Sequence, residues 1–196
     1  MKNKRTHAFT LIELLMVVAI IGILAGILVP TVGAVRKQAN VAASKAQLSN
    51  YVTAIQMFKG DYGYYPLVSG TGDSDNYELN SKGSSTRFIQ TLSGRNPDGS
   101  VVSSFVGKLN GNRRKVAYHN FSESEFFISY DDIVSVDQIS DRFNNINISI
   151  EIDTDGDGFV KPSPTENAPD NPIRTPVTAY VDADESIGAP SYTLWD

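Results

Sequence analysis

The chain has 196 residues, which fits one globular domain with attached segments. It contains no cysteine, which excludes disulfides, thiolate catalysis and cysteine-ligated metals. The formal net charge of −5 gives no general reason to expect a nucleic-acid partner.

The charge is unevenly distributed along the chain. Residues 31–115 hold 11 Lys/Arg against 5 Asp/Glu, whereas residues 116–196 hold 3 against 16. Two interpretations remain open. The first is that the acidic part is an ordinary solvated surface. The second is that it has a binding role: either the basic part of one subunit meets the acidic part of a neighbour, or the acidic part binds cations.

The N-terminus consists of a basic flank followed by an apolar run. Residues 1–8 carry three positive charges, and the run from Phe9 to Val29 is apolar except for Glu13. At a rise of ~1.5 Å per residue a helix of this length spans about 31 Å, close to the ~30 Å core of a bilayer. The flank is therefore expected in the cytoplasm, and the C-terminal part is expected to be exported.

Glu13 decides between three interpretations of this segment. A plain signal anchor, or a signal peptide cut after the small residues 32–34, leaves the carboxylate unexplained. A charge at mid-helix costs ~2.5–3.5 kcal/mol on the insertion scale. Cleavage between Ala8 and Phe9 explains it, because a new α-ammonium then lies one helical turn from Glu13. In a bundle, the amine of one copy could pair with Glu13 of the next, which favours assembly.

The string "AFTLIELLMVVAIIGILAGILVP" resembles the prepilin N-terminus of type IV pilins and type II secretion pseudopilins. The resemblance implies that a prepilin peptidase cuts before Phe9, that the new amine is methylated, and that Glu13 guides subunit docking. One departure is visible, since the residue before the cut is usually Gly and here is Ala8.

Small residues and a proline occupy the end of the apolar run. Gly22 and Gly26 form a small-xxx-small pair that lets helices approach closely in lipid. Pro30 cannot donate to the residue four positions back, so a kink or loosening is expected near Gly26. The resemblance further implies that this stretch can extend when filaments form.

An amphipathic stalk helix is predicted over residues 30–60. Its apolar stripe has helical spacing, and Ala39, Ala42, Ala43 and Ala46 extend it upstream. The stripe consists of Leu48, Tyr51, Val52, Ile55 and Phe58. Gly60 is the expected left-handed residue after the helix. The following Asp61, Gly63, Tyr65 and Pro66 resemble a turn of secretion major pseudopilins.

Residues 61–196 are predicted to form an exported α+β head, in which a small antiparallel sheet packs against the stalk helix. A short helix is expected near Ser85–Leu92, and the alternation in INISIEI predicts one buried and one wet strand face. The predicted strand runs are VVSSFVG, RKVAYHNF, EFFISYDDIV, INISIEID, VTAYV and SYTLW.

The string DTDGDGF is the metal-like pattern of the chain. Asp153, Asp155 and Asp157 alternate, and such carboxylates in one loop suit calcium. The twelfth position of an EF-hand loop would be Pro164, so another acid, Glu166 or Asp170, would have to complete the shell. An ordinary acidic turn is the alternative.

A second acidic loop carries Asp182 and Asp184. The resemblance to major pseudopilins, which hold a structural calcium near the C-terminus, implies a role for these two residues. Nothing pairs a nucleophile with a base, and His119 is expected to serve packing or to lie on the surface. The chain is therefore predicted to have no enzymatic activity.

The resemblance, together with these patterns, implies a pseudopilus subunit of a type II secretion system. Residues 1–8 would be the leader and residues 9–29 the membrane and filament-core helix. The implied partners are further copies, minor pseudopilins, a prepilin peptidase and an inner-membrane assembly platform. The alternatives are a type IV pilus subunit or a membrane-tethered, calcium-dependent binding domain.

Overall fold

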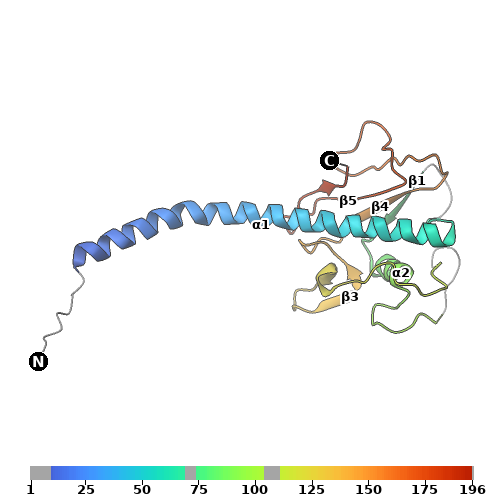
Figure 1. The fold of residues 1–196 in the computed structure, drawn as a ribbon, viewed down its shortest axis with the longest axis horizontal. Coiled ribbons are helices and arrows are strands. Elements are labelled where there is room, and N and C mark those ends of the chain that lie inside the picture. Colours follow the sequence, from blue (N-terminus) through green and yellow to red (C-terminus); the bar gives the residue numbers. More distant parts are fainter. Residues whose placement is uncertain (1–9, 69–73, 104–110, 196) are drawn as a thin grey trace, which may run out of the picture. The chain divides into compact units, whose positions relative to one another are not determined.

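The computed structural model describes residues 10–68, 74–103 and 111–195 and has the expected α+β fold (Figure 1). A single long helix precedes short strands and one further α-helix. The elements are α1 (Leu11–Tyr62), β1 (Ser74–Glu78), α2 (Lys82–Ser93), η2 (Glu123–Glu125), β2 (Phe126–Ile128), β3 (Val134–Ile139), β4 (Ile148–Asp153), β5 (Val177–Val181) and β6 (Tyr192–Thr193).

The chain divides after Asn40 into two compact units, and α1 contributes to both. Residues 11–40 of α1 carry the apolar run, and the helix continues through Pro30 without interruption. The second unit, residues 41–196, is called the C-terminal unit below.

The end of α1 differs from the prediction by one turn. Gly60 is helical, and Gly63 is the residue with a left-handed backbone, at φ 77°. The Gly63 N–H donates to the Lys59 carbonyl at 2.8 Å, and the Lys59 ammonium donates to the Gly63 carbonyl at 2.9 Å. These bonds satisfy helix-end groups that would otherwise lack partners.

The core of the C-terminal unit lies between α1 and a four-stranded antiparallel sheet of order β1-β4-β5-β6. The predicted stripe on α1 is confirmed: Leu48, Tyr51, Ile55 and Phe58 are buried, and Val52 packs against the cluster. The predicted alanine extension is wrong, because Ser44 and Gln47 take the buried positions upstream.

Three of the predicted strand runs contain β4, β5 and β6, and EFFISYDDIV contains β2. The run RKVAYHNF forms no strand, since Tyr118 and His119 donate their N–H groups to the Leu92 carbonyl instead. Part of VVSSFVG lies outside the described residues. The pairing of β2 with β3 and the edge strand β1 were not predicted.

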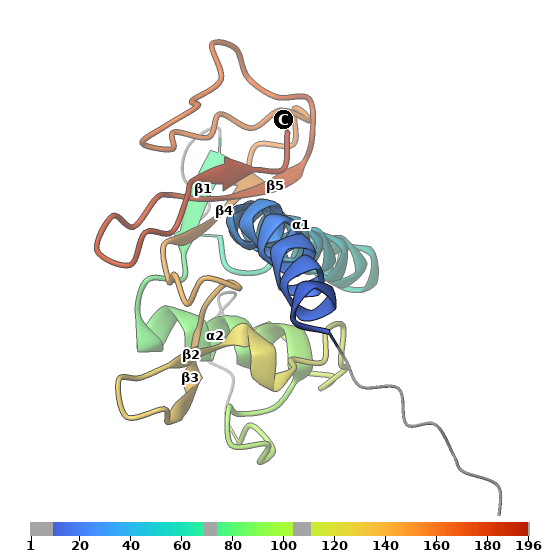
Figure 2. The ribbon, with the colours of Figure 1, turned by 90° about the vertical axis from the view of Figure 1, so that its left-hand side faces the viewer.

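The prediction that β4 has one wet face is wrong, because all six of its residues are buried. Figure 2 shows the segment between β4 and β5 on the side of the sheet away from α1. Val160, Pro162 and Pro164 of that segment are buried, which indicates that it covers the second sheet face.

Candidate functional site

The apolar run at the start of α1, residues 11–29, has no cover among the described residues. Every Leu, Ile, Val and Met from Leu11 to Val29 is exposed, and a Cβ added at Gly22 or Gly26 would meet nothing within 4 Å. By length and composition this helix could cross a membrane. A surface that is apolar all round requires lipid or other helices as its surroundings.

Glu13 lies in the first turn of α1 and is part of a local cap. Its Oε2 accepts hydrogen bonds from the Thr10 N–H at 2.8 Å and the Thr10 hydroxyl at 2.7 Å. The Glu13 N–H in turn donates to the Thr10 Oγ1 at 3.3 Å. This reciprocal pair is a capping box, which the spacing Thr-x-x-Glu indicates and which the sequence reasoning missed. Ala8 and Phe9 lie outside the described residues.

The carboxylates of Asp153, Asp155 and Asp157 come together in the loop after β4. Each offers an oxygen atom, and these atoms lie within 4.8 Å of one another. Asp153 is buried at the strand end, whereas Asp155 and Asp157 are exposed. Among the described residues, neither Glu166 nor Asp170 belongs to this group.

Backbone hydrogen bonds shape this acidic loop. Asp153 accepts from the N–H groups of Gly156 at 2.7 Å and Gly158 at 3.0 Å, and both glycines have positive φ, at 84° and 86°. Asp155 and Asp157 each accept from the N–H two residues on. These bonds alone account for an acidic turn, and the remaining lone pairs on the carboxylates suit a hard cation.

Asp182 and Asp184 lie outside this group of three carboxylates and make hydrogen bonds of their own. Asp182 Oδ1 accepts from the Thr165 N–H at 2.7 Å, which attaches the segment between β4 and β5. Asp184 Oδ1 accepts from the Ser186 hydroxyl at 2.6 Å and its N–H at 3.0 Å. Within the described ranges, neither residue joins a group of three acidic ligands.

His119 is part of a buried polar cluster beneath α1. Glu125 Oε2 accepts the Tyr51 hydroxyl at 2.7 Å and lies 2.9 Å from His119 Nε2, and Gln47 donates to the Tyr51 oxygen at 2.9 Å. Burial by itself would raise the pKa of Glu125, but hydrogen bonds from His119, Ser122 and Tyr51 lower it below its ordinary value. The cluster joins α1 to η2 and has the character of a structural contact.

Comparison with known proteins bears on the N-terminal segment. Residues 3–29 match the family described as "Prokaryotic N-terminal methylation motif". The match covers the N-terminal part of the chain, in the segment whose sequence resembles a prepilin N-terminus. The matched range contains Glu13 and both small residues of the Gly22–Gly26 pair.

Two curated proteins of different systems are similar to part of this chain. The type II secretion system core protein G of Pseudomonas aeruginosa is 39% identical over 66 residues, which are 34% of this chain and 46% of that protein. The type IV wide pilus major component PilA4 of Thermus thermophilus is 45% identical over 62 residues, 32% of this chain and 47% of that protein. The chain thus spans about half the length of these relatives. No solved structure gave a significant match.

Proposed function

We propose that this chain is a structural subunit of the pseudopilus of a type II secretion system. One observation carries the proposal: a single carboxylate, Glu13, lies in the first turn of α1, within a run of residues 11–29 that is otherwise apolar and exposed. After cleavage between Ala8 and Phe9, the amine of one copy pairs with Glu13 of the next. The apolar helices then form the filament interior, which removes their surface from lipid and water alike.

The precursor is anchored in the bacterial inner membrane by a single span, with its leader in the cytoplasm and its C-terminal unit in the periplasm. A prepilin peptidase removes the leader, and an assembly platform driven by a cytoplasmic ATPase adds subunits. Minor pseudopilins are further partners. The subunit works mechanically, without enzymatic activity and without nucleic acid, as the periplasmic filament grows and helps to push folded substrates out.

A type IV pilus subunit for adhesion, motility or DNA uptake is the second candidate, supported by the similarity to the Thermus pilus component. A neighbouring gene for a secretin favours secretion, and one for a retraction ATPase favours the pilus. A third candidate, which is not a filament subunit, is a membrane-tethered, calcium-dependent binding domain.

Mass spectrometry of the protein from its native membrane tests the processing step. Under the filament proposal the mature chain begins with a methylated Phe9. A start at Val35 supports a released domain, and an intact Met1 supports a plain anchor, so either result contradicts the proposal.

The capping box provides a matched control for the role of Glu13. Glu13→Ala removes both the cap and the charge, whereas Thr10→Ala weakens the cap by about 1 kcal/mol and retains the charge. We expect both variants to insert into the membrane. Filament yield from sheared cells should fall strongly only for Glu13→Ala. If the filament yield falls equally in both variants, Glu13 acts merely as a cap; if it stays normal in both, Glu13 has no role in assembly.

We also propose that calcium binds the loop of Asp153, Asp155 and Asp157. The support is the convergence of three carboxylates, one of them buried, on a loop with two left-handed glycines. Binding there would hold the loop after β4 in place, since metal binding energy adds to folding energy. This contribution would stabilise an exported domain that has no cysteine.

Melting of the full chain in detergent, with calcium or with a chelator, tests this cation site. At a free concentration of 100 times Kd, calcium should stabilise the C-terminal unit by ~2.7 kcal/mol. Asp155→Asn combined with Asp157→Asn should abolish the calcium effect, and the exposed Asp170→Asn should preserve it. Tyr65 gives a second readout: burial, and then the charge of Asp153, raise its pKa, so a bound cation should lower it. A melting temperature insensitive to the chelator contradicts the proposal.

A further inference from the structure

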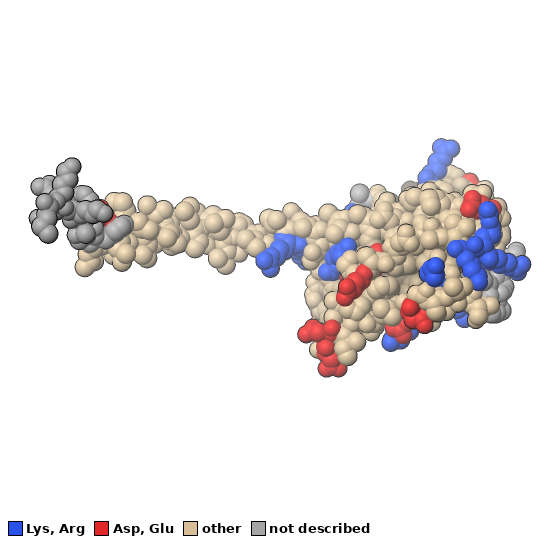
Figure 3. All heavy atoms as spheres, turned by 60° about the horizontal axis from the view of Figure 1, so that its bottom comes forward, with Lys and Arg blue, Asp and Glu red and all other residues tan. Residues whose placement is uncertain are grey.

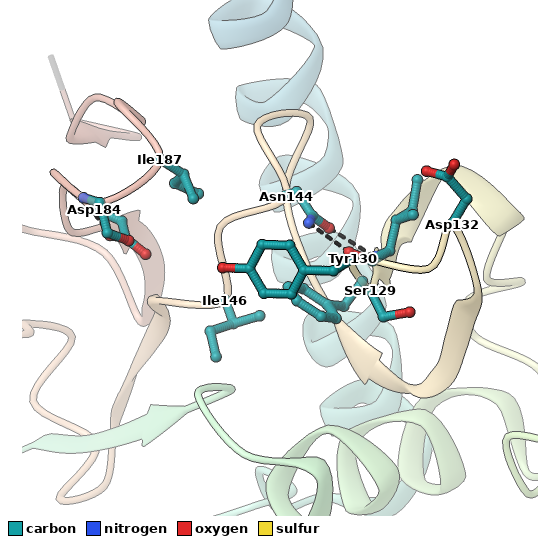
Figure 4. A pocket seen from close by; sticks show the side chains of 10 residues that line it. Ser129, Tyr130, Asp132, Asn144, Ile146, Asp184 and Ile187 are labelled. Carbon is teal, nitrogen blue, oxygen red and sulfur yellow. Dashed lines mark hydrogen bonds between the residues drawn. The ribbon is translucent and has the colours of Figure 1, made fainter.

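The C-terminal unit has a groove between the β2–β3 hairpin and the loop that joins β5 to β6. Its volume is about 510 Å³. Figure 4 shows Asp132 and Asp184 on opposite sides of the groove, with Tyr130 and Ile146 between them. The Tyr130 ring is fully exposed. An apolar floor with an aromatic ring and a carboxylate on each side suits long cationic side chains.

Both walls of this groove are held in position. Asn144 accepts from the Ile128 N–H at 2.7 Å and donates to the Ile128 carbonyl at 2.8 Å, which fastens the hairpin (Figure 4). Asp184 and Ala189 exchange backbone bonds at 3.1 and 3.0 Å across the other wall. Among the described residues, no Lys or Arg lies within ion-pair distance of Asp132 or Asp184. The groove is therefore a preorganised acidic surface without its counter-charge.

A basic turn with the complementary character lies at the other end of the same unit. Arg113, Arg114 and Lys115 are consecutive and exposed. The turn is rigid because the buried Asn112 side chain donates to the carbonyls of Thr91 at 2.9 Å and Val116 at 2.7 Å. On the face shown in Figure 3, Lys and Arg side chains gather at this end, and acidic side chains are seen both among them and toward the opposite end.

The two surfaces are far apart along α1. The Arg114 N–H donates to the Tyr62 hydroxyl at 2.8 Å, so the basic turn lies beside the end of the helix. The groove is connected to Ser44, because Ser44 accepts from the Arg142 N–H at 3.1 Å and the chain reaches Asn144 two residues later. Ser44 and Tyr62 are about 27 Å apart along the helix axis at ~1.5 Å per residue. One copy therefore cannot bring its own basic turn into its own groove.

We propose that the groove around Tyr130 receives the basic turn 113–115 of a second copy of this chain. Two different surfaces at opposite ends of the C-terminal unit make a heterologous contact, which propagates into an open assembly. The inference rests on the proposed filament, in which copies are displaced along their helices. The turn at the Tyr62 end of one copy then faces the groove at the Ser44 end of the next. The ionic contact sets register and specificity between copies.

Because the chain has no cysteine, a pair of introduced cysteines reports this contact directly. The full-length variant Lys115→Cys with Asp132→Cys, expressed with its assembly genes, should give a ladder of dimers and longer species with a short bismaleimide. The pair Lys161→Cys with Asp132→Cys is the control and should give at least tenfold less product, because Lys161 is exposed but lies outside both surfaces.

Charge exchange provides the second test. Lys115→Glu or Asp132→Lys alone should reduce filament yield roughly tenfold, the control Lys161→Glu should have no effect, and Lys115→Glu with Asp132→Lys together should restore the yield. Normal filaments from both single variants overturn this inference and leave the proposed function intact. Failure of the unmodified chain to form filaments overturns both. Binding of DNA through Lys115 by the purified full chain, without any ladder, would assign the basic turn to a polyanion and also overturn the inference.

Discussion

The two units of the chain handle apolar surface in opposite ways. In residues 11–40 every large apolar side chain up to Val29 is exposed. In the C-terminal unit, α1, α2 and the four-stranded sheet enclose a continuous core. The first unit requires lipid or other helices to cover its apolar side chains, whereas the second buries most of its own in one core.

Polar groups show the same contrast. The acidic residue of the apolar helix is held by one neighbour, Thr10, three positions away in the sequence. Glu125, one of the buried acids of the C-terminal unit, is held by groups from several segments, including Tyr51 on α1. The local cap leaves Glu13 exposed and therefore accessible to another copy, whereas Glu125 is buried and its hydrogen bonds are made within the unit.

The largest expected effect comes from removing core volume. Phe88 is fully buried and contacts Tyr51 edge to face, with ring centroids 5.1 Å apart. Phe88→Ala should destabilise the C-terminal unit by about 3–5 kcal/mol, because it leaves a cavity. Near-UV circular dichroism of the full chain in detergent measures the melt. Leu24→Ala, on the exposed helix, is the control and should change this melt by less than ~0.5 kcal/mol.

A smaller loss is expected when the buried cluster is broken. Glu125→Gln removes the charge that accepts from Tyr51 and His119, and it should cost about 2–3 kcal/mol. Glu123→Gln, on the exposed side of the same η2, should cost almost nothing. Chemical denaturation of the two variants checks this, and equal stabilities would show that the cluster contributes no stability.

The same carboxylate predicts how the unit responds to acid. The folded pKa of Glu125 is lowered, so its contribution is fully present above the unfolded pKa of ~4.3 and is lost as pH falls through the folded value. The slope of stability against pH below ~4.3 should therefore be shallower in Glu125→Gln than in the unmodified chain. An unchanged slope would assign the acid sensitivity to other carboxylates.

A smaller change in stability is expected from substitutions at the end of α1. Gly63→Ala places a side chain at φ 77° and should cost about 1 kcal/mol. Gly60→Ala, inside the helix and with nothing within 4 Å of the added carbon, should be neutral or stabilising by ~0.5–1 kcal/mol. Thermal melts of the pair distinguish the two glycines. If Gly60→Ala is the more destabilising of the two variants, the left-handed residue that ends α1 is Gly60 and not Gly63.

The sequence was sufficient to predict an element where apolar residues repeat along one face or cluster in a short run. Helical periodicity identified the stripe of α1 from Leu48 to Phe58, and the β-branched and aromatic runs between turn residues identified β4, β5 and β6. Neither pattern could identify β1, whose residues SDNYE become a strand only through pairing with β4. The buried Ser44 and Gln47 were also missed, because their partners Arg142 and Ser140 lie more than 90 residues away.

The candidate sites follow the same rule. The three carboxylates of the Asp153 loop are close in sequence, and their convergence was predictable. The Thr10–Glu13 cap was equally local and could have been found from its spacing. The groove around Tyr130 was not predictable, because its walls come from the hairpin 126–139 and the loop 182–189, which only the folded chain brings together.

The smallest effect on the isolated chain should come from Gly26→Ala. An added Cβ meets nothing within 4 Å, and alanine favours a helix by roughly 0.5–1 kcal/mol over glycine, so helix content in detergent should stay equal or rise. In a filament, neighbouring helices that pack closely on the Gly22–Gly26 face would collide with the new methyl group. We therefore expect an unchanged melt of the C-terminal unit together with a reduced filament yield. Ala25→Gly, which removes a methyl group from the adjacent position, is the control. If Gly26→Ala filaments form in normal yield, the helices meet through another face, although the exposed apolar surface would still require a cover.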